Sequence, residues 1–221
     1  MKYLQVDDEF YDRLKSYAVF IPLIKIDGKD HILFEVRSKS VSQPGEVSFP
    51  GGGLEKGEDF KDAAIRETME ELKLCEQDIA YTGYSSMILT SSYRLIKSFY
   101  GRINKNFEEI KYNEEVESIF TVDLDFFISN PPISYKAPYK MEFPEDFPFD
   151  KIPNGEDYKF QTGYNEMFFY DTKPVIWGLT AKMLKNFIES WSRNEKWYFA
   201  KNKRLCKSKS SNWIYFLCEK P

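Results

Sequence analysis

The sequence is poor in the residues that several classes of protein require. Its 221 residues include one histidine and three cysteines, so neither a histidine-based hydrolytic triad nor a disulfide framework is indicated. The cysteines also lack the spacing of metal ligands, which favours reduced thiols in a cytosolic protein. No stretch approaches the roughly 20 apolar residues that a membrane-spanning helix needs. The acidic first 15 residues have no apolar run of the signal-peptide kind, so we expect a cytoplasmic protein without a membrane partner.

Charge of one sign is not in large excess, since the formal net charge is −4. Basic residues nevertheless gather near the C-terminus, at Lys196, Lys201, Lys203, Arg204, Lys207 and Lys209. Such a stretch attracts phosphate, but a solvated loop or hairpin is the more common structure for it. The aromatic residues that flank it more often pack on a core than stack on bases. No nucleic-acid partner is therefore predicted.

One segment combines a glycine turn with a group of acidic residues. The chain passes from Phe49-Pro50-Gly51-Gly52-Gly53 to Arg66-Glu67-Thr68-Met69-Glu70-Glu71, a pattern that predicts a strand, a loop and a helix. Because an α-helix turns about 100° per residue, Glu67, Glu70 and Glu71 at i, i+3 and i+4 project from one face. The opposite face is expected to be apolar, with Ile65, Met69 and Leu72.

Three carboxylates on one helix face repel one another, so such a group usually has a cation to neutralise it. Hard oxygen ligands suit Mg2+ or Mn2+, whose coordination is commonly completed by phosphate oxygens of a substrate. The glycines permit close approaches, which would let a backbone carbonyl join the ligands. Arg66 is placed to hold Glu58 and Glu67 by charge-assisted hydrogen bonds. The alternative is a merely solvated acidic face, which the full spacing disfavours.

The stretch from Gly52 to Leu74 resembles the Nudix box of the Nudix hydrolases. Two positions depart from the usual pattern: Thr68 stands where an apolar residue is usual, and Lys73 where the second glycine is usual. Neither position is a ligand, so the departures concern how the helix packs and ends. The positions in register with the box are Gly52, Glu58, Arg66, Glu67, Glu70, Glu71 and Leu74.

The resemblance implies a hydrolase of a diphosphate bond in a nucleotide, in which a metal-activated water attacks phosphorus. It implies that Glu67, Glu70 and Glu71 ligate Mg2+ or Mn2+ together with the carbonyl of Gly51. Arg66 and Glu58 would orient Glu67. The general base is expected to be Glu115 on a later loop, with Glu114 as the fallback and Glu67 itself as a further alternative.

A second resemblance, to the coenzyme A diphosphatase branch of the family, covers most of the chain from Tyr17 to Ile188. It is carried by residues 32–38, residues 44–52 and the stretch Ile176-Trp177-Gly178-Leu179-Thr180-Ala181. Coenzyme A has a 3′-phosphate that requires a cation, and Arg37 is the candidate. The connection from Arg37 to Gly45 is one residue shorter than usual, and Val41-Ser42-Gln43 replaces a stretch where Arg and His are common.

The shortened connection keeps other activities open. The enzymatic alternative is a Nudix pyrophosphatase for ADP-ribose, a dinucleotide or a nucleoside triphosphate. A non-catalytic nucleotide-binding module is the alternative from a different class. The intact acidic residues disfavour it. The sequence leaves open whether the chain forms a homodimer.

The order of predicted elements is similar to the Nudix fold, an α+β fold in which helices sandwich a mixed β-sheet. Strands are predicted over residues 17–26, 32–36, 47–49, 81–89, 98–102, 116–122 and 167–170, and helices over residues 59–72 and 179–191. Residues 1–221 are expected to form a single domain. It would carry an irregular insertion at about residues 130–165 and a C-terminal extension from about residue 194.

Overall fold

The computed structural model describes residues 14–160 and 163–207, with side chains described up to Arg193. Within these ranges the α-helices are α2 (Phe60–Glu71), α3 (Leu124–Ser129) and α4 (Gly178–Lys207). The strands are β1 (Lys15–Ile26), β2 (Lys29–Arg37), β3 (Val47–Ser48), β4 (Gly51–Gly53), β5 (Ile79–Leu89), β6 (Arg94–Ile103), β7 (Val116–Asp123), β8 (Ile133–Pro138), β9 (Tyr164–Tyr170) and β10 (Ile176–Trp177).

The larger sheet is mixed and is built around β1. β1 pairs in parallel with β6 and antiparallel with β2 and β4, and the order along the sheet is β3-β2-β1-β6-β5, with β7 on β2. The middle of β1, from Phe20 to Ile24, is buried on both faces of the sheet, which explains why these residues are apolar. The mixed sheet confirms the predicted α+β class.

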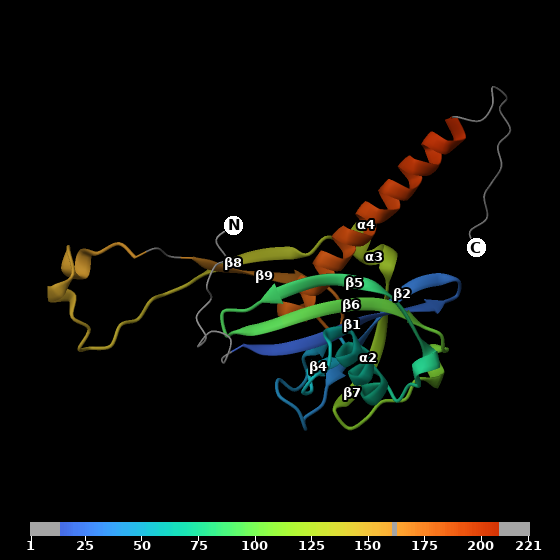
Figure 1. The fold of residues 1–221 in the computed structure, drawn as a ribbon, viewed down its shortest axis with the longest axis horizontal. Coiled ribbons are helices and arrows are strands. Elements are labelled where there is room, and N and C mark those ends of the chain that lie inside the picture. Colours follow the sequence, from blue (N-terminus) through green and yellow to red (C-terminus); the bar gives the residue numbers. More distant parts are fainter. Residues whose placement is uncertain (1–13, 161–162, 208–221) are drawn as a thin grey trace.

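Helices cover the two faces of this sheet (Figure 1). On one face α4 and α3 pack on the largest core cluster, in which Leu184 and Phe187 meet Phe34 of β2. On the other face Leu72 of α2 packs with Leu33 of β2. Because neighbouring side chains of a strand point to opposite faces, Glu35 lies on the α2 side with Leu33. This alternation brings a carboxylate from the sheet towards the acidic helix.

The ends of α2 explain where the helix begins and ends. At its N-terminus the Asp59 side chain accepts hydrogen bonds from the backbone N–H groups of Lys61 (2.7 Å) and Asp62 (3.0 Å), a cap worth about 1 kcal/mol. At its C-terminus Lys73 has a φ of +47°, and the N–H of Leu74 donates to the carbonyl of Met69 at 3.0 Å. Lys73 therefore occupies the left-handed position at which glycine is favoured.

The predicted apolar face of α2 is wrong in part. Ile65 is only half-buried, whereas Thr68 and Glu71 are buried, with 0% and 4% of their surface exposed. Thr68 is tolerated there because its hydroxyl donates to the carbonyl of Ala64 at 2.7 Å. The close packing of Ala63 and Ala64 on the sheet turns the helix so that Glu71 points inward.

Other boundaries differ from the predicted ones. The glycine triplet forms the short strand β4 on β1, and α3 follows β7 directly, where no helix was predicted. The helix predicted to end at residue 191 continues as α4 to Lys207, so the first part of the predicted extension is helical. The basic side chains from Lys196 onward, and residues 208–221 as a whole, lie outside the described part.

The segment predicted to be irregular contains paired strands. β8 and β9 form an antiparallel hairpin, and β10 adds to β9. The hairpin extends away from the main sheet (Figure 1). Its tip has a small aromatic cluster, in which the rings of Phe143 and Phe147 lie 4.6 Å apart between centroids and those of Phe143 and Phe160 lie 4.8 Å apart. The proline-rich sequence concealed β8, whose residues are mostly exposed, whereas the strand predicted over residues 167–170 is the second half of β9.

Candidate metal centre and active site

Arg66 connects the acidic residues of the loop and the helix. Its Nε and Nη2 donate to the two carboxylate oxygens of Glu58 at 2.9 and 3.1 Å. Its Nη1 donates to Glu67 Oε1 at 2.9 Å and to Glu70 Oε2 at 3.3 Å. Nη2 also reaches the carbonyl of Gly53 at 3.1 Å. These bonds raise the pKa of Arg66, chiefly through Glu58, and they require the planar fork of an arginine.

The glycine loop fits closely over the helix. A Cβ atom at Gly52 would collide with the carboxylate of Glu67, and one at Gly51 would collide with the backbone of Ala18 and Val19. Glycine is required at Gly51, where the nearest colliding atoms belong to the backbone, whereas a Cβ at Gly52 would displace the Glu67 carboxylate from its position. The N–H of Gly51 donates to Glu71 Oε2 at 2.8 Å. The loop and the acidic helix therefore form one unit.

Glu71 and Glu35 form a buried acidic pair between α2 and β2. Burial raises the pKa of the Glu71 carboxyl above its ordinary value, and the Glu35 carboxylate raises it further. Burial likewise raises the pKa of Glu35, although the Ser48 hydroxyl donates to Glu35 Oε1 at 2.9 Å. Sequence reasoning missed Glu35. The available signal was a lone carboxylate inside the apolar run Ile32–Val36.

Burial also raises the pKa of Glu67, against the opposing hydrogen bond from Arg66. Glu70 is different, because more than half of its side chain is exposed. The structure thus places Glu67 and Glu71 inside the site and Glu70 at its edge. Arg66 also donates to Glu70, a contact that was not predicted from the sequence, which indicated that Arg66 holds Glu58 and Glu67.

Two of the three candidate bases, Glu114 and Glu115, lie on the loop that precedes β7, and the third, Glu67, lies on α2. The Glu115 charge contributes to the raised pKa values of Glu35, Glu67 and Glu71, so this exposed carboxylate is electrostatically coupled to the acidic group. The backbone carbonyl of Glu114 instead accepts hydrogen bonds from the hydroxyls of Ser38 (2.6 Å) and Ser40 (3.0 Å). We call these two bonds, with the bond from Ser38 N–H to the Glu115 carbonyl at 2.9 Å, the serine clasp.

Arg37 lies at the start of the loop that the serine clasp anchors. Its Nε donates to the carbonyl of Ser42 at 2.8 Å. Its backbone N–H and carbonyl pair with Glu46 and Gly45 at 2.9 and 2.8 Å. The shortened connection is therefore a closed loop, in which the Arg37 backbone pairs with the end of the loop and the Arg37 side chain holds its middle at Ser42. The Arg37 charge lowers the pKa of Glu35, so the guanidinium is electrostatically coupled to the acidic pair.

The residues fit a divalent cation in their donor chemistry. Several carboxylate groups converge from α2, β2 and the loop before β7, and the backbone of the glycine loop approaches Glu67 without a side chain between them. Within residues 14–160 and 163–193, however, no three acidic, histidine or cysteine side chains already stand in the geometry of a metal cage. Arg66 explains this, because it draws Glu67 and Glu70 towards itself.

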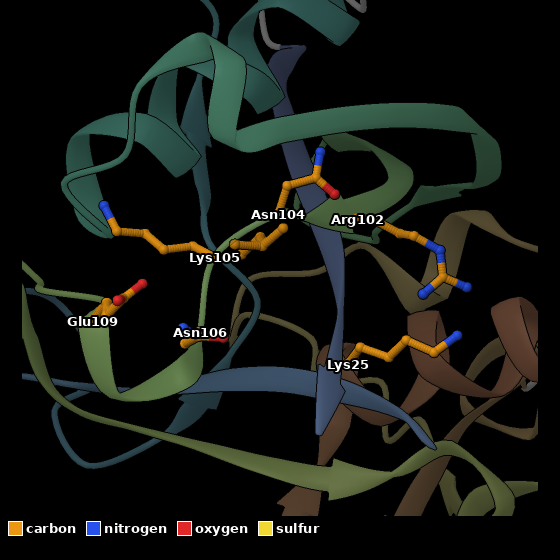
Figure 2. Close-up of a pocket in the computed structure, with 7 residues that line it drawn as sticks. Lys25, Arg102, Asn104, Lys105, Asn106 and Glu109 are labelled. Carbon is orange, nitrogen blue, oxygen red and sulfur yellow. The ribbon is translucent and has the colours of Figure 1, made fainter. Parts of the chain in front are cut away.

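A separate cavity of about 460 Å³ lies at the ends of β1 and β6 (Figure 2). Cationic side chains that line it are paired with carboxylates of the protein: Arg102 donates two hydrogen bonds to Asp30 at 2.7 and 3.1 Å, and the Lys105 ammonium lies 3.8 Å from the Asp78 carboxylate. Figure 2 shows Lys105 and Arg102 pointing in different directions. We therefore assign no ligand to this cavity. Its lining comprises Lys25, Arg102, Ile103, Asn104, Lys105, Asn106 and Glu109.

Half of the chain matches a known domain family. Residues 15–125 match the NUDIX domain family. The chain is 28% identical to Nudix hydrolase 3 of Caenorhabditis elegans over 180 residues, which cover 78% of this chain and 72% of that protein. It is 31% identical to the mouse peroxisomal coenzyme A diphosphatase NUDT7 over 130 residues, which cover 57% of this chain and 55% of that protein.

Among solved structures, an Ap4A hydrolase complex from C. elegans is similar, with 22% identity and a TM-score of 0.45 over 52% of this chain and 85% of that one. None of the helices in the described part of the chain combines the length and the apolar character needed to cross a bilayer. The cytoplasmic location stays a prediction. The domain match spans the glycine loop, the acidic helix and the Glu115 loop, and the chain therefore belongs to the Nudix family, whose members hydrolyse diphosphate bonds with the help of divalent metal ions.

Proposed function

We propose that the substrate is coenzyme A or an acyl-coenzyme A, which the enzyme hydrolyses with Mg2+ or Mn2+ to 3′,5′-ADP and 4′-phosphopantetheine or its acyl form. The observation that carries this assignment is the 31% identity to the mouse coenzyme A diphosphatase. It is supported by the position of Arg37, whose charge acts on the acidic pair from the edge of the site.

The acidic residues would have two functions, binding the cation and accepting a proton. Glu67, Glu70 and Glu71, with the carbonyl of Gly51, would hold the cation. A bound cation neutralises diphosphate oxygens and lowers the pKa of a water molecule. Arg66 holds Glu67 in place from its position between helix and loop. Glu115 would accept the proton of the attacking water, which is supported by the effect of its charge on the pKa values of Glu67 and Glu71.

Two features suit coenzyme A in particular. Arg37 offers a guanidinium for the 3′-phosphate, which such a planar fork binds well. A groove of about 500 Å³ begins at residues 44–47, directly upstream of the glycine loop, and continues along Val175 and Trp177. An uncharged pantetheine arm fits this mixed apolar lining better than a second nucleoside phosphate would.

A substrate panel tests the proposal. Coenzyme A, acetyl-coenzyme A, dephospho-coenzyme A, ADP-ribose, NADH and a nucleoside triphosphate are each assayed with Mg2+ and with Mn2+. If Arg37 binds the 3′-phosphate, coenzyme A is preferred over dephospho-coenzyme A by about tenfold or more, the effect of one charge-assisted contact of about 1.5–3 kcal/mol.

The controls separate the substrate from the reaction. Arg37→Ala should erase most of the preference and leave hydrolysis of dephospho-coenzyme A nearly unchanged. Glu70→Gln should lose hydrolysis of every substrate by orders of magnitude. Equal hydrolysis of coenzyme A and dephospho-coenzyme A by the natural chain, or a clear preference for ADP-ribose, would reject the coenzyme A assignment.

A further inference from the structure

Glu35 is the buried charged residue that the activity above leaves without a role. Only 2% of its surface is exposed, and it lies in β2 opposite Ser48 of β3 and Ile119 of β7. Its neighbours along the strand, Phe34 and Leu33, are fully buried apolar residues. A β-branched apolar residue would satisfy such a strand position, so the fold itself does not require a carboxylate there.

One oxygen of Glu35 has no hydrogen-bond partner among the residues that the structure describes. Ser48 donates to Oε1 at 2.9 Å, whereas Oε2 is buried without a hydrogen bond. A buried carboxylate oxygen of this kind is strongly disfavoured unless a donor or a cation reaches it. This oxygen is therefore available to accept a hydrogen bond or to bind a cation.

The surroundings of Glu35 identify the charge of that ligand. The carboxylate of Glu71 approaches from α2, and the Glu67 and Glu115 carboxylates act on Glu35 from the helix and from the loop before β7. Arg37 is the cation that acts on it, and its Nε is bonded to Ser42. Convergence of negative groups on a buried acceptor calls for a small cation.

We propose that Glu35 is a further ligand of the divalent cation, contributing Oε2 beside Glu71. Glu67 and Glu70 are both bonded to Arg66, whereas Glu35 and Glu71 are bonded to Ser48 and to the Gly51 N–H. Glu35 on the sheet would thus be a fixed ligand, whereas Glu67 and Glu70 on the helix would move from Arg66 towards the cation. This inference rests on the metal dependence proposed above and is independent of the coenzyme A substrate.

The test measures Mn2+ binding to the full chain without substrate, by titration calorimetry and by the loss of the free Mn2+ signal in electron paramagnetic resonance. Glu35→Gln keeps the size of the side chain and its bond to Ser48 but removes the charge. It should weaken Mn2+ binding by about 10- to 100-fold, the usual effect of losing a group that supports a metal site. Asp30→Asn is the matched control, because it removes a carboxylate from the same strand at its far end, and its Mn2+ affinity should equal that of the natural chain.

Ser48→Ala keeps the test valid if Glu35→Gln does not fold, which thermal unfolding in EDTA would reveal. It leaves the carboxylate in place but removes the bond that orients it, so Mn2+ binding should be weaker than in the natural chain. Equal Mn2+ affinity in the natural chain and in each of these variants that folds would overturn the role of Glu35 alone. Absence of Mn2+ binding by the natural chain would overturn the metal dependence itself, whatever the substrate.

Discussion

Replacing Arg66 by lysine probes how the fold positions the acidic residues. Arg66 makes four bonds to three carboxylates and one to a backbone carbonyl, and 23% of its side chain is exposed. Lysine keeps the positive charge, but its donors share a single nitrogen atom. It cannot span Glu58 and Glu67 together, so at least one of these bonds is lost.

The magnitude follows from the number of bonds lost. A hydrogen bond to a charged group contributes about 1.5–3 kcal/mol, and about 1.4 kcal/mol corresponds to a factor of ten in rate. Losing the Glu67 bond alone should lower kcat by about 10- to 100-fold. KM should change little, because the bonds orient a catalytic carboxylate and do not touch substrate.

The assay is steady-state hydrolysis at saturating Mg2+ for the natural chain and for Arg66→Lys. Arg102→Lys is the matched control, since Arg102 also makes two bonds to one carboxylate, that of Asp30, at the other end of the strands. It should alter stability only and leave kcat unchanged. An increase in KM with an unchanged kcat in Arg66→Lys would show that Arg66 contacts substrate, and the positioning role would be wrong.

Three further predictions concern the loop, the helix end and the buried pair. Gly52→Ala should abolish most hydrolysis and weaken Mn2+ binding, because its Cβ collides with the Glu67 carboxylate. Gly53→Ala is the control, since its Cβ meets open space, and it should retain both hydrolysis and Mn2+ binding. Equal activity of the two variants in a steady-state assay would contradict this prediction. Lys73→Gly should raise the free energy of unfolding by about 0.5–1 kcal/mol by relieving a left-handed lysine, measured by urea unfolding, and a lower value would contradict it. In EDTA, the melting temperature should fall as the pH rises above 4.5, the ordinary pKa of a glutamate carboxyl, because the raised pKa values of Glu35 and Glu71 make the folded chain bind more protons than the unfolded chain. Bound Mg2+ should make the melting temperature depend less on pH. Identical pH profiles of the melting temperature with and without Mg2+ would refute this prediction.

The sequence predicted those features that depend on local pattern. The helix was predicted over residues 59–72 and is observed at Phe60–Glu71, because its Asp59 cap and its acidic spacing are both written in adjacent residues. Strands at the centre of the sheet were equally visible as apolar runs. The strands β4 and β8 were not, since one consists of glycines and the other of mostly exposed residues next to prolines.

The site was predictable only where its residues lie close together in sequence. Arg66, Glu67 and Glu58 share one segment, and their contacts follow from its spacing. Glu35 comes from a strand whose pairing with β3 and β7 is set by tertiary structure, so only the folded sheet brings it to Glu71. The inward turn of Glu71 likewise depends on how Ala63 and Ala64 pack, which periodicity alone does not give.

The serine clasp joins two loops that are more than 70 residues apart in the chain. One of them, closed by Arg37, borders the proposed 3′-phosphate position, and the other carries Glu115. An insertion or deletion in the first loop therefore pulls on the second through the hydroxyls of Ser38 and Ser40. Changes in the length of the first loop should therefore affect turnover as well as substrate preference, unless compensating changes at these two serines accompany them.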